Sequence, residues 1–245
     1  MGLGRALDKK RYRNEWKYCE RDVDLQLMKE KIENVLMRDS HAGLNGKYTV
    51  NSLYFDDYKD SCARYNVAGE GNRFKYRIRY YGENAERLWL EKKEKKNNYC
   101  HKRKCAISTE EYLAISNGNA MDVFWNSKEK LIKEFCTDIV TKRFLPRVII
   151  SYEREAFIEP ITNIRITFDY NITASEQIDK FLEKSYLQVP ILDKEKHVLE
   201  IKFDDILPSH IRRYLCTDVL IQRSFSKYYL GRIAIQEKNR FSKCF

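Results

Sequence analysis

Apolar and charged side chains alternate along several short segments of this chain, and this alternation constrains the fold most. In residues 74–80, aromatic and aliphatic side chains alternate with Lys75, Arg77 and Arg79. Because successive side chains of a β-strand point to opposite faces, such a segment forms a strand with one apolar and one basic face. The same alternation, or an apolar run typical of a strand, recurs at residues 11–18, 48–55, 88–93, 147–154, 164–169 and 198–203. The sequence therefore predicts about seven strands.

Segments of helical period lie between these strands. The pair Ser108 and Glu111 forms a capping box, which predicts a short helix that Gly118 can end. Ser127 predicts the start of a longer helix with an apolar stripe. Two further amphipathic helices are predicted at residues 21–38 and 206–215. Such helices need an apolar surface to cover.

The composition favours one folded domain over residues 1–245. Apolar residues make up 43% of the chain, which is enough for a sizeable core. The nine glycines and four prolines leave little material for a flexible linker. The formal net charge of +10 implies a general attraction to polyanions, without choosing among nucleic acid, lipid headgroups and phosphate compounds.

The sequence also predicts a cytoplasmic protein without a transmembrane segment. Residues 1–13 lack the apolar core of a signal peptide, and no later stretch approaches the roughly 18 apolar residues of a membrane span. The seven cysteines are odd in number and scattered, as is typical of reduced thiols. Cys100, His101 and Cys105 lie close together, but a zinc site needs a further ligand pair, so unpaired thiols are the favoured interpretation.

Two arrangements fit the alternation of side chains. In the first, the charged faces are solvated and the apolar faces form an ordinary core. In the second, helices cover the apolar faces from outside, and the charges point into an enclosed, water-filled barrel. The charged faces favour arginine with isolated glutamates, where a solvated face would carry more threonine, serine and glutamine. Because buried cations without partners are costly, the second arrangement predicts a multiply charged anion as ligand.

The charged segments follow one another in a recognisable order. They are RNEWKY (13–18), SLYFDD (52–57), KYRIR (75–79), LEKKE (90–94), NY (98–99) with Lys102, YEREAF (152–157), RITFD (165–169), LEIK (199–202) and SKY (226–228). Together they resemble the catalytic domain of the vacuolar transporter chaperone (VTC) type polyphosphate polymerases, in the triphosphate tunnel metalloenzyme superfamily, and especially its stand-alone bacterial members. The resemblance spans about residues 11–231.

This resemblance implies an α+β fold in which a closed, eight-stranded antiparallel β-barrel forms a tunnel, with amphipathic helices packed outside. It also implies transfer of the terminal phosphoryl group of ATP to a growing inorganic polyphosphate chain. By position, Arg77, Arg79 and Lys227 resemble the residues nearest the transferred group. The phosphate-binding set implied by the resemblance is Lys17, Arg77, Arg79, Lys93, Lys102, Arg154, Arg165, Ser226 and Lys227, with Lys104 competing for the place of Lys102.

The resemblance further implies a divalent cation, Mn²⁺ or Mg²⁺. Glu200 matches the position of the metal ligand, and Glu15 is a weaker candidate beside it. Hard cations of this kind take oxygen ligands from one or two carboxylates and from phosphate oxygens. The transition state of phosphoryl transfer spreads charge over the equatorial oxygens, which arginine and lysine can stabilise.

One departure from related enzymes bears on the reaction. Related hydrolases and cyclases carry a glutamate at the start of the first strand, where this chain has Arg13. Replacing an acidic group with a cation favours transfer to phosphate over transfer to water.

Two alternatives remain open at this stage. One is a tripolyphosphatase or nucleoside triphosphatase, and the other is a non-catalytic polyanion or RNA binder with residues 74–81 as an exposed platform. The expected partners are ATP and polyphosphate rather than nucleic acid, with a separate membrane protein needed for any export.

Overall fold

A computed structural model describes residues 13–39, 43, 45–96, 99–215 and 220–241. The predicted strand at residues 11–18 and the resemblance at Asn98 therefore lie partly outside the described residues. The strands are β1 (Asn14–Arg21), β2 (Met37–Arg38), β3 (Tyr48–Asp56), β4 (Asn72–Tyr81), β5 (Leu88–Lys96), β6 (Tyr99–Ile107), β7 (Leu145–Glu159), β8 (Ile164–Ser175), β9 (Val189–Pro190) and β10 (Lys196–Phe203). The helices are α1 (Asp22–Glu33), α2 (Ser61–Val67), α3 (Thr109–Ser116), α4 (Ala120–Asn126), α5 (Lys130–Lys142), the 3₁₀ turn η1 (Ile178–Lys180), α6 (Ser209–Tyr214) and α7 (Lys227–Phe241).

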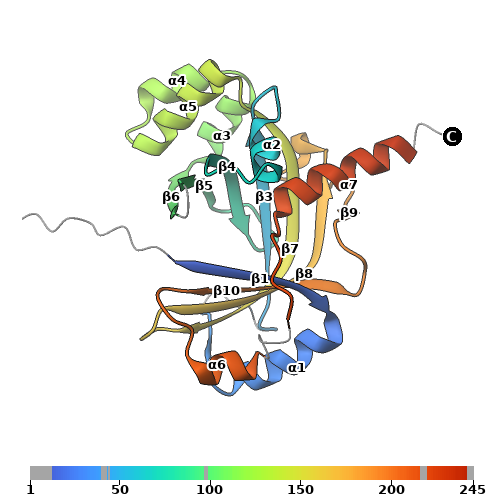
Figure 1. Ribbon diagram of the computed structural model, residues 1–245. Helices are drawn as coiled ribbons and strands as arrows, with labels where there is room; N and C mark the ends of the chain where they lie inside the picture. The colour runs from blue at the N-terminus through green and yellow to red at the C-terminus, as the bar shows by residue number, and fades with distance from the viewer. Residues whose placement is uncertain (1–12, 40–42, 44, 97–98, 216–219, 242–245) are drawn as a thin grey trace, which may run out of the picture.

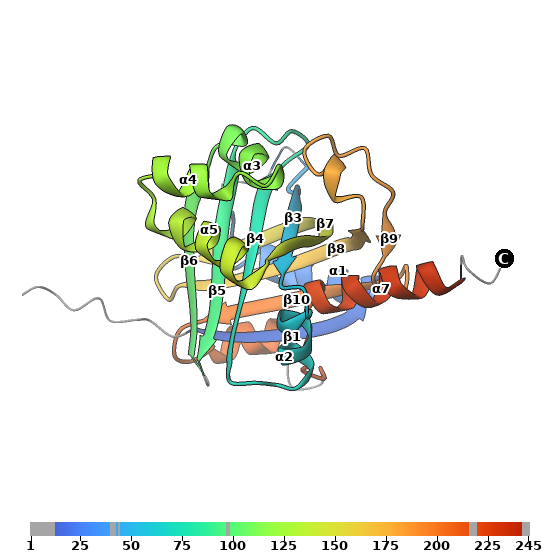
Figure 2. The same cartoon turned by 90° about the horizontal axis from the view of Figure 1, so that it is seen from above.

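All strands of the described residues belong to one antiparallel sheet in the order β1-β10-β8-β7-β3-β4-β5-β6, with β2 paired to β7 and β9 paired to β8. The long strands β7 and β8 connect its two halves. The pairing of β7 with β8 shifts register between Ser151 and Glu153, and such bulges bend a strand. In Figure 2 the strands β4–β6 accordingly run across the direction of β1 and β10.

The α+β class is confirmed, but the prediction of a closed eight-stranded barrel is wrong. Within the described part of the chain the sheet has ten strands and stays open, because no backbone ladder joins β1 to β6. The two halves meet through side chains instead: Lys93 on β5 contacts Glu15 on β1. These two long side chains span the gap between backbones that do not pair.

Helices cover the outer faces of both halves (Figure 1). Helices α1 and α6 pack on β1, β10 and β8, where Leu25, Ile166 and Leu199 belong to one buried cluster. Helices α3–α5 pack on the other half, where Ile78 and Phe135 belong to a second cluster. Each half-sheet therefore has its apolar core on its outer side, which leaves the inner faces to the charged side chains.

The local helix signals are confirmed in part. Ser108 and Glu111 form both hydrogen bonds of the capping box at the start of α3, at 3.1 and 3.0 Å. The prediction that Ser127 caps the next helix is wrong. Ser127 ends α4, and α5 begins only at Lys130, because the apolar residues before Ser127 form a helical turn of their own.

The structure also contains a strand that the sequence pattern does not predict. Strand β6 carries His101 and Arg103 on its outer face and Lys102 on its inner face. Its outer face is apolar only toward the end of the strand, where Cys105 and Ile107 join the core, so the alternation is too short to predict a strand. On the outer face, Glu134 of α5 accepts two hydrogen bonds from Arg103, at 2.6 and 3.0 Å. In the described residues, every helix is too short or too polar to span a bilayer.

Candidate functional site: a basic surface between the half-sheets

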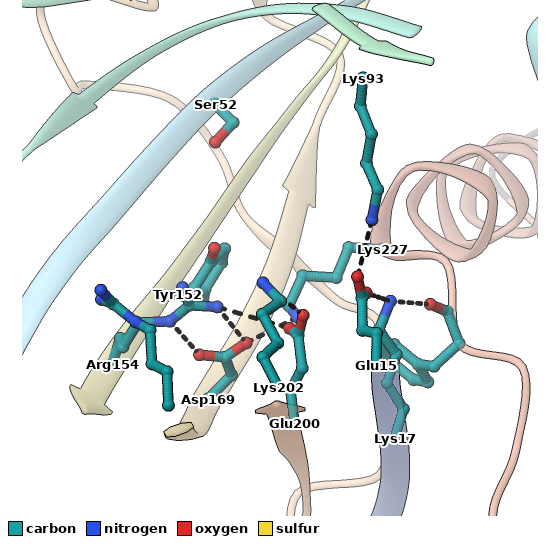
Figure 3. Close-up of polar contacts among 12 residues, drawn as sticks. Glu15, Lys17, Ser52, Lys93, Tyr152, Arg154, Asp169, Glu200, Lys202 and Lys227 are labelled. Atoms are coloured by element: carbon teal, nitrogen blue, oxygen red, sulfur yellow. Dashed lines mark hydrogen bonds and ion pairs between the residues drawn. The ribbon is translucent and has the colours of Figure 1, made fainter. Parts of the chain in front are cut away.

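The inner faces of the two half-sheets carry a concentrated set of charged side chains. They come from β1, β4, β5, β6, β7, β8 and β10 and from the start of α7, and several are shown in Figure 3. Cations outnumber carboxylates in this set: Lys17, Lys75, Arg77, Arg79, Lys93, Lys102, Arg154, Arg165, Lys202 and Lys227 against Glu15, Glu91, Asp169 and Glu200. The structure thus brings together the basic side chains that the resemblance implies.

Arg77 on β4 is held by two neighbouring strands. Its Nε donates to Glu91 Oε2 at 2.6 Å, and its NH1 group donates to the Tyr54 hydroxyl at 2.9 Å. Lys102 Nζ lies 2.6 Å from the other oxygen of Glu91. Burial opposes ionisation of Glu91, but Arg77, Arg79 and Lys102 hold the pKa of its carboxyl far below the usual range. The guanidinium is therefore fixed in place by an ionised partner.

Arg79, two residues further along β4, is almost fully buried, with 4% of its surface exposed. It donates to Ser52 Oγ at 2.9 Å and to the Tyr152 hydroxyl at 3.2 Å. Its distance to Glu91 is 4.0 Å, so its charge is only loosely balanced. A buried guanidinium with mainly neutral partners is suited to receive an anion.

Three lysines lie side by side at matching positions of β4, β5 and β6. The register pairs Lys75 with Lys93 and Lys93 with Lys102. Like charges directly opposite one another destabilise a sheet, so a shared anionic ligand would explain this row. Burial lowers the pKa of Lys75 to about 8, and burial together with Arg77 lowers the pKa of Lys102 to about 7.

Arg154, Asp169 and Lys227 form a buried ion cluster on the other half-sheet. Arg154 donates two hydrogen bonds to Asp169, at 2.6 and 2.8 Å, and Lys227 Nζ lies 2.6 Å from Asp169 Oδ2. Asp169 is inaccessible to solvent. Burial lowers the pKa of Lys227, but Asp169 and Tyr152 outweigh this and raise it above its usual value. The Lys227 ammonium therefore stays charged at neutral pH.

Two carboxylates lie beside this cluster. Glu200 is ion-paired to Lys202 at 2.7 Å and lies 3.9 Å from Arg154. Burial and Glu200 raise the pKa of Glu15, but Lys17 and the neighbouring lysines outweigh them and lower it to about 2. Burial also opposes ionisation of Glu200, and its surrounding lysines hold its pKa well below the usual value. Both groups are ionised at neutral pH.

These carboxylates fit the divalent cation that the resemblance implies. Glu15 and Glu200 offer only oxygen donors, which Mg²⁺ and Mn²⁺ prefer. In the part of the chain that the structure describes, no three His, Cys, Asp or Glu side chains are grouped to hold a metal alone. The remaining ligands would then come from phosphate oxygens and water.

The other predicted residues lie at the margins of this surface. Arg165 is ion-paired to Asp39 at 2.7 Å and donates to the Tyr48 hydroxyl at 3.1 Å. Ser226 Oγ lies 3.2 Å from Lys75 Nζ. Lys104 lies over the Trp89 ring at 4.5 Å, whereas Lys102 contacts Glu91, the partner of Arg77.

The site also contains residues that the sequence does not predict. Asp169, Lys75 and Lys202 lie on the charged faces of predicted strands, so alternation could have identified them. Tyr54 and Tyr152 are not among the predicted site residues, yet their hydroxyls accept hydrogen bonds from Arg77 and Arg79. Only the register between neighbouring strands shows that these tyrosines face the arginines, and a single sequence does not give that register.

The faces of β4 also bear on the nucleic-acid alternative. An RNA-binding platform at residues 74–81 would expose aromatic and basic side chains together. Tyr76 and Tyr80 are instead fully buried on the outer side, and Tyr76 packs against Phe135 of α5 at a ring distance of 4.9 Å. Arg79 points to the inner side. The structure therefore lacks the exposed stripe that this alternative requires.

Comparisons with known proteins agree with this arrangement. A protein from Bacillus halodurans that is proposed to be an adenylate cyclase is similar in fold, with a TM-score of 0.51 and 13% identity over 88% of this chain and 94% of that one. A proposed adenylyl cyclase from Hippeastrum, described as having a dominant triphosphatase activity, has a TM-score of 0.50 and 12% identity over 91% of this chain and 95% of that one. At these identities the likeness concerns the fold alone.

The family comparison is more specific. No curated protein matches the chain significantly. Residues 12–235 match the VTC domain, and this range contains every charged side chain of the inner surface. The chain therefore belongs to the VTC domain family.

Proposed function

We propose that this protein is a polyphosphate polymerase that transfers the terminal phosphoryl group of ATP to a growing polyphosphate chain. The observation that carries the proposal is the inner surface, where arginines and lysines outnumber carboxylates. An anion with several charges in a row would neutralise this surface. A triphosphate and a polyphosphate chain both have that form.

The arginines would grip the phosphate chain of the nucleotide. Arg77, Arg79 and Arg154 present planar guanidinium groups that can donate two hydrogen bonds to one phosphate group. They are already held by Glu91, Tyr152 or Asp169, so binding requires little reorganisation. Such fixed donors stabilise the charge that develops on the transferred group.

Lys227 would neutralise charge on the phosphoryl group in transit. Its ammonium is charged and lies 2.6 Å from Asp169 Oδ2 and 4.9 Å from the centroid of the Tyr152 ring. A divalent cation held by Glu200, with Glu15 as helper, would supply further charge neutralisation at the phosphate oxygens. The attacking end of polyphosphate is already anionic, so no strong general base is needed.

The position of Arg13 supports transfer to phosphate over transfer to water. Arg13 forms an ion pair with Asp204 at 3.2 Å, at the end of β1. It therefore adds no carboxylate to the pair of Glu15 and Glu200 that could orient a water molecule. A tripolyphosphatase or nucleoside triphosphatase is the alternative that the experiment must separate.

The test is to incubate the purified protein with ATP and Mn²⁺, and then with Mg²⁺, and to resolve the products on a gel. We expect a ladder of acid-labile polyphosphate, which Lys227→Ala and Glu200→Ala each suppress while the circular dichroism spectrum is unchanged. Release of orthophosphate alone by the wild-type protein would contradict the proposal.

A further inference from the structure

Four consecutive residues, the last two before α7 and the first two of the helix, each contact a different strand around the site. In chain order, the contacts are Phe225 O with Lys17 Nζ of β1 (3.1 Å), Ser226 Oγ with Lys75 Nζ of β4 (3.2 Å), Lys227 Nζ with Asp169 of β8 (2.6 Å) and the Tyr228 hydroxyl with Asp56 of β3 (2.6 Å). Both half-sheets are therefore connected through this short segment.

The hydrogen bond between Tyr228 and Asp56 joins α7 to β3 and is deeply buried. Tyr228 is 1% exposed and Asp56 is inaccessible to solvent. Asp56 is itself fixed, because its carboxylate accepts backbone N–H groups of Cys62 and Ala63 at 2.8 and 3.1 Å. A short hydrogen bond to a charged, immobile acceptor is among the stronger anchors a side chain can make.

Further contacts hold the same turn of α7 in one position. The Tyr228 ring stacks on the Tyr54 ring at 5.3 Å, and Tyr54 in turn accepts a hydrogen bond from Arg77. One turn later, Arg232 donates two hydrogen bonds to Asp60, at 2.7 and 3.1 Å. The direction in which α7 leaves the site is therefore set by Tyr228 and its neighbours.

We propose that Tyr228 is a positioning residue, whose hydrogen bond to Asp56 places the neighbouring Lys227 ammonium at the phosphate-binding surface. The proposal rests on the function proposed above for Lys227. The two side chains leave adjacent backbone positions toward different strands, Tyr228 toward β3 and Lys227 toward β8. A rotation or slide of α7 that frees one hydroxyl therefore displaces the ammonium as well.

The variant Tyr228→Phe removes the hydroxyl and keeps the ring that stacks on Tyr54. We would measure binding of inorganic tripolyphosphate by calorimetry for wild type, Tyr228→Phe, Lys227→Ala and the double variant. A charge-assisted hydrogen bond that is lost or misplaced weakens binding roughly 10-fold or more, so we expect about 10-fold for Lys227→Ala and a smaller loss for Tyr228→Phe. If Tyr228 acts through Lys227, the double variant binds no more weakly than Lys227→Ala.

Tyr229→Phe is the matched control. Tyr229 is the next residue and is half-buried rather than buried, so this variant should bind tripolyphosphate as the wild type does. Asp56→Asn is a second variant that weakens the same hydrogen bond from its acceptor side, and it should reproduce the pattern. Equal weakening by Tyr228→Phe in the wild-type and Lys227→Ala backgrounds would overturn the proposal, as would unchanged binding by both Tyr228→Phe and Asp56→Asn. This cycle needs no turnover, so a wild-type protein that binds tripolyphosphate but makes no polymer would refute only the proposed function.

Discussion

Glu15 on β1 and Lys93 on β5 form an ion pair of 2.9 Å across the opening of the sheet. These strands lie near opposite ends of the strand order, and no backbone ladder joins them in the described residues. The Lys93 side chain is 45% exposed, so the pair stabilises the fold by at most about 1 kcal/mol. Its importance lies in bringing a carboxylate and a cation of the site together at the seam between the two halves.

Replacing Glu15 should have opposite effects with and without metal. Glu15→Gln removes a negative charge next to Lys17 and Lys93, so tripolyphosphate should bind several-fold more tightly in the presence of a chelator. With Mn²⁺ present, loss of a metal ligand should weaken binding instead. Calorimetry under both conditions checks this. Glu20→Gln, on the opposite face of β1, is the control, and a change of the same sign in both conditions would contradict the metal assignment.

Asp169→Asn should destabilise the protein strongly, because it leaves Arg154 and Lys227 buried without their shared carboxylate. Breaking a buried charge cluster in this way costs about 3–5 kcal/mol. Tripolyphosphate supplies negative charge at the same place, so it should raise the melting temperature of the variant more than that of the wild type. Thermal unfolding with and without the ligand measures both effects.

The control for this experiment is Asp193→Asn. Asp193 pairs with Lys196 at 2.6 Å, but its side chain is 76% exposed, so its loss should change stability little. If Asp169→Asn were as mild as this control, the cluster would not be an uncompensated charge site.

The affinity for polyphosphate should fall between about pH 7 and pH 9. Burial depresses the pKa of Lys75 to about 8, and burial with Arg77 depresses that of Lys102 to about 7, so both lose their charge across this range in the free protein. An anion binds the protonated forms, so binding takes up protons and weakens as pH rises. The unfolded chain holds these protons until about pH 10, so the same two groups should make stability rise with pH over this range.

Titration calorimetry with tripolyphosphate at several pH values tests this prediction. The double variant Lys75→Gln/Lys102→Gln should bind more weakly at pH 7 and should lose most of the pH dependence. A wild-type affinity that stayed constant from pH 7 to pH 9 would show that neither lysine titrates in the site.

Gly231 allows α7 to approach the sheet closely. A Cβ atom at this position would lie 2.3 Å from Ile150 Cδ1 and 3.3 Å from Ala174 Cβ. Gly231→Ala should therefore destabilise the protein by about 1–3 kcal/mol, even though alanine favours a helix. Chemical denaturation measures the change, and Ile150→Val, which shortens the opposing side chain, should recover part of the loss. Additive losses in the double variant would contradict the proposed close contact.

The sequence predicts the strands best where one face is apolar. Strand β4 shows why: Tyr76 and Ile78 pack outward against helices, so Arg77 and Arg79 necessarily point inward. Strand β6 was missed because His101 and Arg103 occupy the first half of its outer face, where Arg103 forms ion pairs with Glu134 of α5 and Glu94 of β5 in place of apolar packing. Alternation of side chains therefore predicts a strand only when the side chains on its buried face are apolar.

Closure of the sheet and the finer structure of the site do not follow from the strand patterns of the sequence. The residue pattern within a strand does not show which strands lie at the edges of the sheet or whether those edges pair. The open sheet and the contact between Glu15 and Lys93 therefore could not be predicted. Tyr228 and Asp56 are likewise distant in the chain, and each alone is typical of ordinary packing or capping. Their pairing follows only from how α7 lies on the sheet.

The most direct test of the central claim is the ratio of ADP formed to orthophosphate released during turnover of ATP with Mn²⁺. Transfer to phosphate forms ADP while the terminal phosphoryl group enters the polymer. We therefore predict that ADP accumulates with little orthophosphate, and that Lys227→Ala slows its formation. Equal amounts of ADP and orthophosphate from the wild-type protein throughout the reaction would contradict the account and assign the site to hydrolysis.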